Sequence, residues 1–110
     1  MKFGQASVKS HFAHGPCAGM SIEEVAAGLR AGRIAPDQLP IAFIVGHGER
    51  IALNNRSLLA LRRAGLAPTR RIDRTGVPQF EKLLDAHLAG GPPSDCIRVR
   101  GGPPGTSRIE

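Results

Sequence analysis

The sequence predicts a small α+β domain, built from a short mixed sheet and about three helices. The chain has 110 residues, which fits a single domain with one core. Three stretches carry apolar residues at helical spacing, and the short apolar or alternating runs between them are typical of strands. The 14 glycines and 9 prolines indicate short elements joined by well-marked loops. We therefore expect one domain over residues 1–110, with residues 1–20 and 101–110 loosely ordered.

The first third of the chain contains one weak strand signal and one well-marked helix. Ala6–Val8 is the only strand-like piece before that helix. Ser21 and Glu24 have the spacing of a capping box, in which the Ser hydroxyl accepts from the Glu amide and the Glu carboxylate reaches back. The helix should run to Ala31 and end at Gly32. Its apolar face is formed by Ile22, Val25 and Leu29.

The remaining strands are predicted by their apolar pattern. Ile41–Val45 is continuously apolar, which is typical of a buried strand. Gly46–Gly48 is typical of a turn, and Glu49–Leu53 fits the returning strand of a hairpin. Arg70–Arg74 fits an edge strand. Cys96–Arg100 alternates apolar and basic residues, as a half-buried strand does.

Two more helices are expected after the hairpin. Asn54 or Asn55 can cap the first of them, and Gly65 ends it. Pro78 suits the first turn of the second, which residues 90–93 interrupt. The buried face of the first should consist of Leu58, Leu59, Leu61 and Leu66. The apolar face of the second should consist of Phe80, Leu83, Leu84 and Leu88.

Almost all of the net charge of +6 lies in the middle of the chain. Residues 41–74 carry seven arginines against Glu49 and Asp73, a net +5, and no lysine. Because arginine suits bidentate contacts with phosphate and carboxylate, this stretch indicates a nucleic acid, a nucleotide or an acidic protein as partner. The alternative is a solvated basic face. The arginines are Arg50, Arg56, Arg62, Arg63, Arg70, Arg71 and Arg74.

Composition argues against several classes of protein. With four Phe and neither Trp nor Tyr, the chain has few rings for a base-stacking platform. No stretch approaches the ~20 apolar residues of a membrane span, and nothing resembles a signal peptide. We expect Cys17 and Cys96 to be free thiols rather than a disulfide. No zinc-ligand spacing occurs, so we expect no metal site, including at His11, His14 and Cys17.

The junction between the hairpin and the next helix is the most informative segment for function. It reads Asn54-Asn55-Arg56. Amide groups at a helix start favour anions, and Arg56 in the first turn adds a fixed positive charge beside them. The sequence therefore predicts a phosphate site at this junction, with Asn55 and Arg56 as ligands. The alternative is that both asparagines only cap and turn the chain.

Five segments of this chain occur in an order that is found in a known superfamily. They are Phe3–Val8, Ser21–Val25, Pro40–Val45, Leu53–Leu58 and Cys96–Gly101. Together they resemble the ParB/sulfiredoxin-like superfamily, and within it the ParB-like toxin domains at the C-termini of bacterial polymorphic toxins, such as Rhs and contact-dependent effectors. The resemblance extends over nearly the whole chain. It implies a ParB/sulfiredoxin-like fold whose shared element is a phosphate-binding helix start.

The chain departs from the family pattern at two positions. Asn54 stands where the family block has Asp, and Ser57 stands where it has a second Arg. The missing carboxylate weakens metal-assisted or general-base chemistry there, although Asn54 can still orient a substrate by hydrogen bonding. We therefore name Glu49, His47 and Asn54 as catalytic candidates, with a turn or surface role as the alternative for the first two. A sulfiredoxin-like activity would need a Cys just ahead of the helix, where this chain has asparagines.

The C-terminal strand and the end of the first strand supply further candidate ligands. Arg98 and Arg100 are two residues apart and should share one face of their strand, with Ile97 and Val99 buried opposite. The pair is expected to bind substrate phosphate, or else to protect a sheet edge by its charge. Ser10 is expected to line the same cleft, with a surface role as the alternative.

The resemblance implies a toxin domain of an interbacterial effector that acts on nucleic acid or a nucleotide, with a nuclease favoured. It also implies that the domain is delivered into the cytoplasm of a target bacterium. A cognate immunity protein should bind and block it, and because the cleft is cationic we expect that protein to be acidic. The cofactor stays open between a divalent metal and a nucleotide. The alternatives are a transferase toxin, by ADP-ribosyl or phosphoryl transfer, and a non-catalytic module that binds DNA or a nucleotide.

Overall fold

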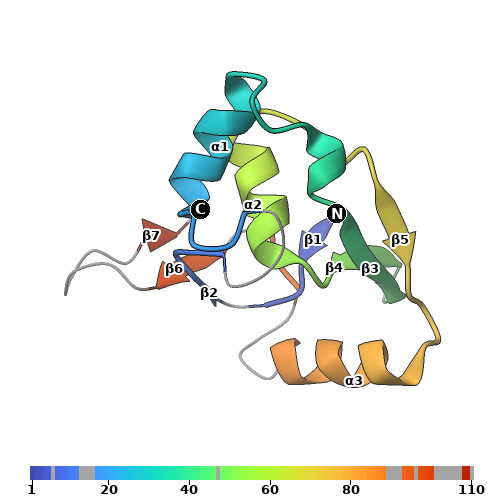
Figure 1. Cartoon of the computed structure of the whole chain (residues 1–110). Coiled ribbons are helices and arrows are strands. Elements are labelled where there is room, and N and C mark those ends of the chain that lie inside the picture. Colours follow the sequence, from blue (N-terminus) through green and yellow to red (C-terminus); the bar gives the residue numbers. More distant parts are fainter. Residues whose placement is uncertain are drawn as a thin grey trace.

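The computed structural model confirms an α+β fold with three helices and a four-stranded mixed sheet (Figure 1). The structure describes residues 1–5, 7–12, 17–46, 48–88, 93–95, 97–100 and 108–109. Of residues 7, 98, 100, 108 and 109 only the backbone is described.

The main sheet is built around the predicted hairpin. Its strand order is β1-β4-β3-β5. Strands β3 and β4 pair antiparallel across a turn in which Gly48 has a φ of +75°, a conformation that favours glycine. The outer strands β1 and β5 pair parallel with the hairpin, so the sheet is mixed. The bounds are Lys2–Phe3 (β1), Ile41–Gly46 (β3), Glu49–Ala52 (β4) and Arg71–Asp73 (β5).

The three helices begin and end close to their predicted positions. They are α1 (Ile22–Arg30), α2 (Asn55–Arg63) and α3 (Pro78–His87), and a short 3-10 helix, η1, covers Pro36–Gln38. The capping box of α1 is confirmed, with two reciprocal hydrogen bonds of 3.0 Å between Ser21 and Glu24.

The helices cover the two faces of the main sheet. Helices α1 and α2 lie on one face and α3 lies on the other (Figure 1). Alternation along β3 explains this arrangement, because Ile41 packs into the core shared with α1 and α2 while Ile44 packs with Leu84 of α3. Buried aliphatic side chains therefore hold the start of α2 and the end of α3 against the same short strands.

A second, smaller sheet lies beside the first and has the order β2-β6-β7. Its strands are Ser7–Lys9 (β2), Arg98–Arg100 (β6) and Arg108–Ile109 (β7). The strand predicted at Ala6–Val8 is thus shifted by one residue, and β6 begins two residues later than predicted. Strand β1, which has two residues, has no periodic pattern from which it could be predicted.

Two residues that were expected on buried helix faces are exposed. Leu66 is 36% exposed because it follows Gly65, whose φ of +74° turns the chain away at the end of α2. Leu83 is 42% exposed because Leu84, about 100° further round α3, is the residue that faces the sheet.

Candidate functional site

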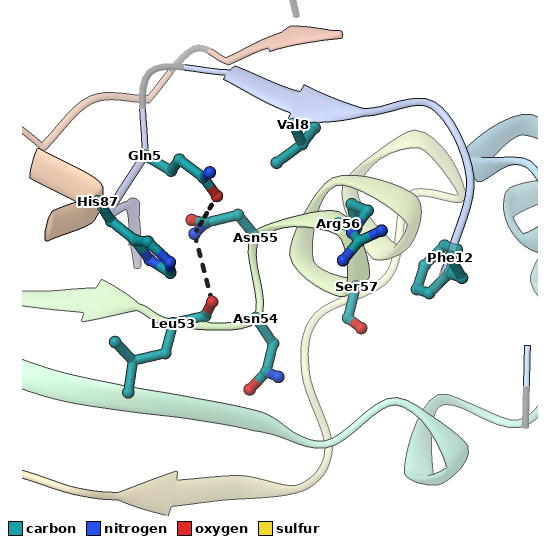
Figure 2. A pocket seen from close by; sticks show the side chains of 9 residues that line it. All are labelled: Gln5, Val8, Phe12, Leu53, Asn54, Asn55, Arg56, Ser57 and His87. Carbon is teal, nitrogen blue, oxygen red and sulfur yellow. Dashed lines mark hydrogen bonds between the residues drawn. The ribbon is translucent and has the colours of Figure 1, made fainter. Parts of the chain in front are cut away.

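A pocket of about 280 Å³ lies at the predicted junction, where the start of α2 meets the N-terminal segment around β2 and the end of α3. Figure 2 shows the side chains that surround it. Polar groups and three apolar side chains share the wall, so the pocket offers both hydrogen bonds and apolar contact. The lining residues are Gln5, Val8, Phe12, Leu53, Asn54, Asn55, Arg56, Ser57 and His87.

Asn55 holds two walls of the pocket together. Its side chain is 3% exposed, and it is the only buried polar residue in the described part of the chain. The amide oxygen accepts from the Gly4 backbone N–H at 2.8 Å, and the amide nitrogen donates to the Leu53 carbonyl at 3.3 Å. A longer contact of 3.5 Å joins that nitrogen to Gln5. Asn55 therefore ties the segment after β1 to the first turn of α2.

Asn54 occupies the N-cap position but does not cap the helix. Its side-chain oxygen accepts from the backbone N–H of Ala42 in β3 at 2.7 Å. The first turn of α2 consequently has no side-chain cap, and it contains no acidic residue. The positive end of the α2 dipole thus lies beside the pocket without a side-chain cap or an acidic residue, and this arrangement favours an anion.

Arg56 is held in the pocket wall by two contacts. One guanidinium nitrogen donates to the His11 carbonyl at 2.6 Å, and the guanidinium carbon lies 5.9 Å from the centre of the Phe12 ring. An arginine has five N–H groups, so this single bond leaves donors for a ligand. Arg56 is the one cation of the 41–74 stretch that lines this pocket.

His87, the last residue of α3, was not among the predicted site residues. Its imidazole enters the pocket from the side opposite Arg56 and Phe12 (Figure 2). Its Nδ1 atom is buried and has no hydrogen-bond partner among the residues that the structure describes. Burial lowers the pKa of His87 below its ordinary value of 6.5. The ring lies 31 residues from Arg56 in the sequence, and no spacing signal links the two.

The structure brings together only part of the predicted site. Asn54, Asn55 and Arg56 line the pocket, whereas Glu49 is exposed, pairs with Gly46 at the far end of the hairpin and does not line it. His47 lies outside the described residues.

The other three predicted ligands, Ser10, Arg98 and Arg100, are not among the described residues that line the pocket. Ser10 bonds to His11 Nδ1 at 2.8 Å, next to the carbonyl that Arg56 binds. In the β2–β6 pairing Arg98 is opposite Ser7 and Arg100 is opposite Lys9, and the side chains of these arginines lie outside the described part of the chain.

The other arginines of the basic stretch are dispersed over the fold. Arg62 stacks on Phe3 at 4.6 Å and donates to the carbonyls of Met1 and Asp95, so it anchors the N-terminus. Arg63 pairs with Glu23 of α1. These two arginines therefore stabilise the packing between segments of the chain.

The described residues contain neither a cluster of metal ligands nor a membrane-spanning helix. No three His, Cys, Asp or Glu side chains among them gather in a way that could hold a metal ion. None of the described helices is long and apolar enough to cross a membrane. Cys17 is a buried free thiol, and burial raises its pKa. Cys96 lies outside the described residues.

The pocket thus combines an uncapped helix start, a guanidinium and an imidazole that is neutral at neutral pH. The first two suit a phosphate, and the third can accept a proton. Comparison with protein-family models, with curated proteins and with solved structures finds no match for this chain.

Proposed function

We propose that this chain is the effector domain of an interbacterial toxin that acts on nucleic acid or a nucleotide, with a substrate phosphate bound at the start of α2. The observation that carries the proposal is the pocket in which the uncapped first turn of α2 and the guanidinium of Arg56 lie together. Backbone amides at a helix start and an arginine are the groups that proteins use most directly for phosphate.

The size of the pocket supports a single nucleotide unit as the group that enters it. A volume of about 280 Å³ lies just below the ~300–1,000 Å³ that is usual for small-ligand sites, so the pocket suits a small group. The apolar side chains of Val8, Phe12 and Leu53 offer a surface for a sugar or base beside the phosphate. A longer nucleic acid would pass over the pocket mouth and place one phosphate at a time in it.

The order of elements also supports the proposal. The segment β3–β4–α2 is a hairpin followed directly by a helix that begins Asn-Arg. This is the arrangement that the resemblance to ParB-like toxin domains implies. An effector of this kind is delivered into the cytoplasm of a rival cell and is neutralised by an immunity protein. The net charge of +6 favours an acidic one.

A second candidate function is a non-catalytic module that binds DNA or a nucleotide. It is favoured by the position of Glu49, which is exposed on the hairpin and does not line the pocket. Such a module would bind through the same α2 start and would leave its ligand unchanged.

The test is inducible expression in the bacterial cytosol, with wild type, Arg56→Ala and a matched control, Arg71→Ala. Arg71 is exposed on the edge strand β5, so its loss removes the same charge away from the pocket. We expect wild type and Arg71→Ala to arrest growth with degraded nucleic acid, and Arg56→Ala to abolish this effect. Because Arg56 makes one hydrogen bond and one ring contact, its loss should lower the free energy of unfolding by only about 1 kcal/mol.

The other outcomes separate the alternatives. Arrest with intact DNA and RNA would indicate a transferase or a nucleotide-consuming enzyme. Normal growth with well-expressed, folded wild type would contradict the toxin proposal and leave the binding module. Full toxicity of a folded Arg56→Ala would contradict the assignment of the phosphate site to α2.

A further inference from the structure

Among the nine described residues that line the pocket, His87 is the one whose side chain can accept a proton near neutral pH. The guanidinium of Arg56, which also lines the pocket, has N–H donors and no acceptor. The remaining side chains are amides, a hydroxyl and apolar groups. Of these described residues, the one at the end of α3 is therefore the candidate for a base.

The packing of α3 brings His87 to the pocket. Leu84, one turn before His87 on α3, is 5% exposed and packs with Ile44 and Ile51 of the hairpin. That packing carries the last turn of α3 to the edge of the pocket. The ring approaches from the side of Gln5 and Asn55, and Arg56 stands across from it (Figure 2).

The described surroundings of the ring do not satisfy both of its nitrogen atoms. Nδ1 is buried and meets no donor or acceptor in the part of the chain that the structure describes. Buried polar atoms are almost always satisfied in folded proteins, and each exception calls for an explanation, of which a catalytic role is one. A side chain that accepts a proton from a bound substrate would have such a role.

We propose that His87 is the catalytic base of a ribonuclease reaction in this pocket, in which a ribose 2′-hydroxyl attacks the neighbouring phosphodiester. The inference rests on the proposed function and names its substrate class as RNA. Arg56 and the first amides of α2 would hold the phosphate, and His87 would stand on the sugar side.

The reaction balances without another reactant. The 2′-hydroxyl gives its proton to the imidazole, its oxygen forms a bond to phosphorus, and the bond from phosphorus to the 5′-oxygen breaks. The departing 5′-oxygen takes a proton from solvent water, and the imidazolium later returns its own proton to solvent. The products are a 2′,3′-cyclic phosphate and a 5′-hydroxyl.

Two physical arguments favour this reaction over others that use the same phosphate site. The 2′-hydroxyl is attached to the substrate beside the phosphorus, so the enzyme does not have to position a separate nucleophile. The pocket then needs a base, a phosphate ligand and donors for the developing negative charge, and its lining contains all three. The lowered pKa of His87 keeps the imidazole neutral, and therefore able to accept a proton, at neutral pH.

The test uses the purified full chain and a short RNA labelled at both ends. Wild type should cleave the RNA into products that end in a 2′,3′-cyclic phosphate and a 5′-hydroxyl. A 2′-O-methyl group at the cleaved position should block cleavage there, because the nucleophile is lost. His87→Gln should slow cleavage by about 100-fold or more while it binds the 2′-O-methyl RNA as wild type does. Lys82→Gln, an exposed change on the same helix, is the matched control and should behave as wild type.

The outcomes separate this inference from the proposed function. If wild type cleaves RNA and a folded His87→Gln cleaves it equally fast, His87 is not the base, and the phosphate site still stands. If wild type cleaves 2′-O-methyl RNA or DNA as readily as RNA, the 2′-hydroxyl mechanism is overturned even where the variant does not fold. If wild type neither binds nor cleaves any nucleic acid or nucleotide, the proposed function fails and this inference fails with it.

Discussion

The two asparagines at the start of α2 are neighbours in the sequence but have opposite environments. Asn55 is buried and bonded on both sides of its amide, whereas Asn54 is exposed and uses only its oxygen, toward Ala42. An amide can donate and accept at once, and a carboxylate can only accept. Position 55 therefore requires Asn, and position 54 tolerates any side chain with a suitably placed oxygen.

We predict that Asn55→Ala lowers the free energy of unfolding by about 1–3 kcal/mol, because it leaves the Gly4 N–H and the Leu53 carbonyl without their buried partner. Asn55→Asp should lower it further, since a carboxylate oxygen would then face the Leu53 carbonyl. Asn54→Asp is the matched control. It keeps the acceptor for Ala42 and adds a negative charge at a helix start, so stability should be unchanged or slightly higher.

Urea unfolding of the three variants checks this prediction. Equal effects at positions 54 and 55 would contradict it. The control has a second use, because Asn54→Asp places a carboxylate beside the proposed phosphate site. It should weaken the binding of a phosphate-bearing ligand while it leaves the fold intact.

At the scale of elements, the close approach of the chain after β1 to strand β4 shapes the pocket wall. A Cβ atom at Gly4 would lie 2.5 Å from the Ala52 carbonyl oxygen, which is backbone and cannot move freely. The N–H of Gly4 is also the group that Asn55 binds. The backbone at position 4 can therefore approach both β4 and the side chain of Asn55 only because glycine has no side chain.

We predict that Gly4→Ala is destabilising and also reduces ligand binding, because the backbone must shift and the bond to Asn55 is strained. The expected loss is about 1–3 kcal/mol, as for other overpacked sites. Gly46→Ala is the matched control in β3, where a Cβ would meet only the Ile51 side chain at an ordinary 3.6 Å. Thermal melts and ligand titrations of both variants provide the comparison, and equal tolerance of the two changes would contradict this account.

The elements differ in how well the sequence predicts them, for physical reasons. Helix α1 could be placed from its capping box, and the hairpin from an apolar run followed by a glycine turn, because these signals are local. Strand β1 has two residues and owes its form to pairing with β4, so nothing near it in the sequence indicates a strand.

The residues of the candidate site also differ in how well the sequence predicts them. The Asn-Asn-Arg start of α2 was predicted as a phosphate site from its own residues, and the pocket lies at that place. His87 reaches it only because α3 packs across the sheet, and a contact between distant elements has no signature in a single sequence. Glu49 seemed close because it is near in the sequence, but an extended strand carries it away from the helix start.

At the scale of the whole molecule, acid should lower the stability of the domain in two separate pH ranges. The pKa of His87 is lowered by burial in the folded chain, so below its ordinary value of 6.5 the unfolded chain binds the proton more readily. The contribution of His87 to the free energy of unfolding is complete above pH 6.5, and it is lost as the pH falls toward the pKa that His87 has in the folded chain. The pKa values of Glu24 and Asp73 are lowered by hydrogen bonds from Ser21 and Thr75, so their contribution is lost at lower pH, below their ordinary values of 4.5 and 3.8.

We predict that the free energy of unfolding of wild type decreases between pH 7.5 and pH 5.5, and that His87→Gln removes the part of this decrease that belongs to the imidazole. Lys82→Gln should keep the wild-type slope, because Lys82 is exposed on the same helix and does not line the pocket. The measurement is urea unfolding at several pH values in this range. A slope that is the same in wild type and His87→Gln would mean that the ring is not held neutral by the fold. The ring would then have the proton affinity of an ordinary histidine, and burial would not be what favours its neutral form.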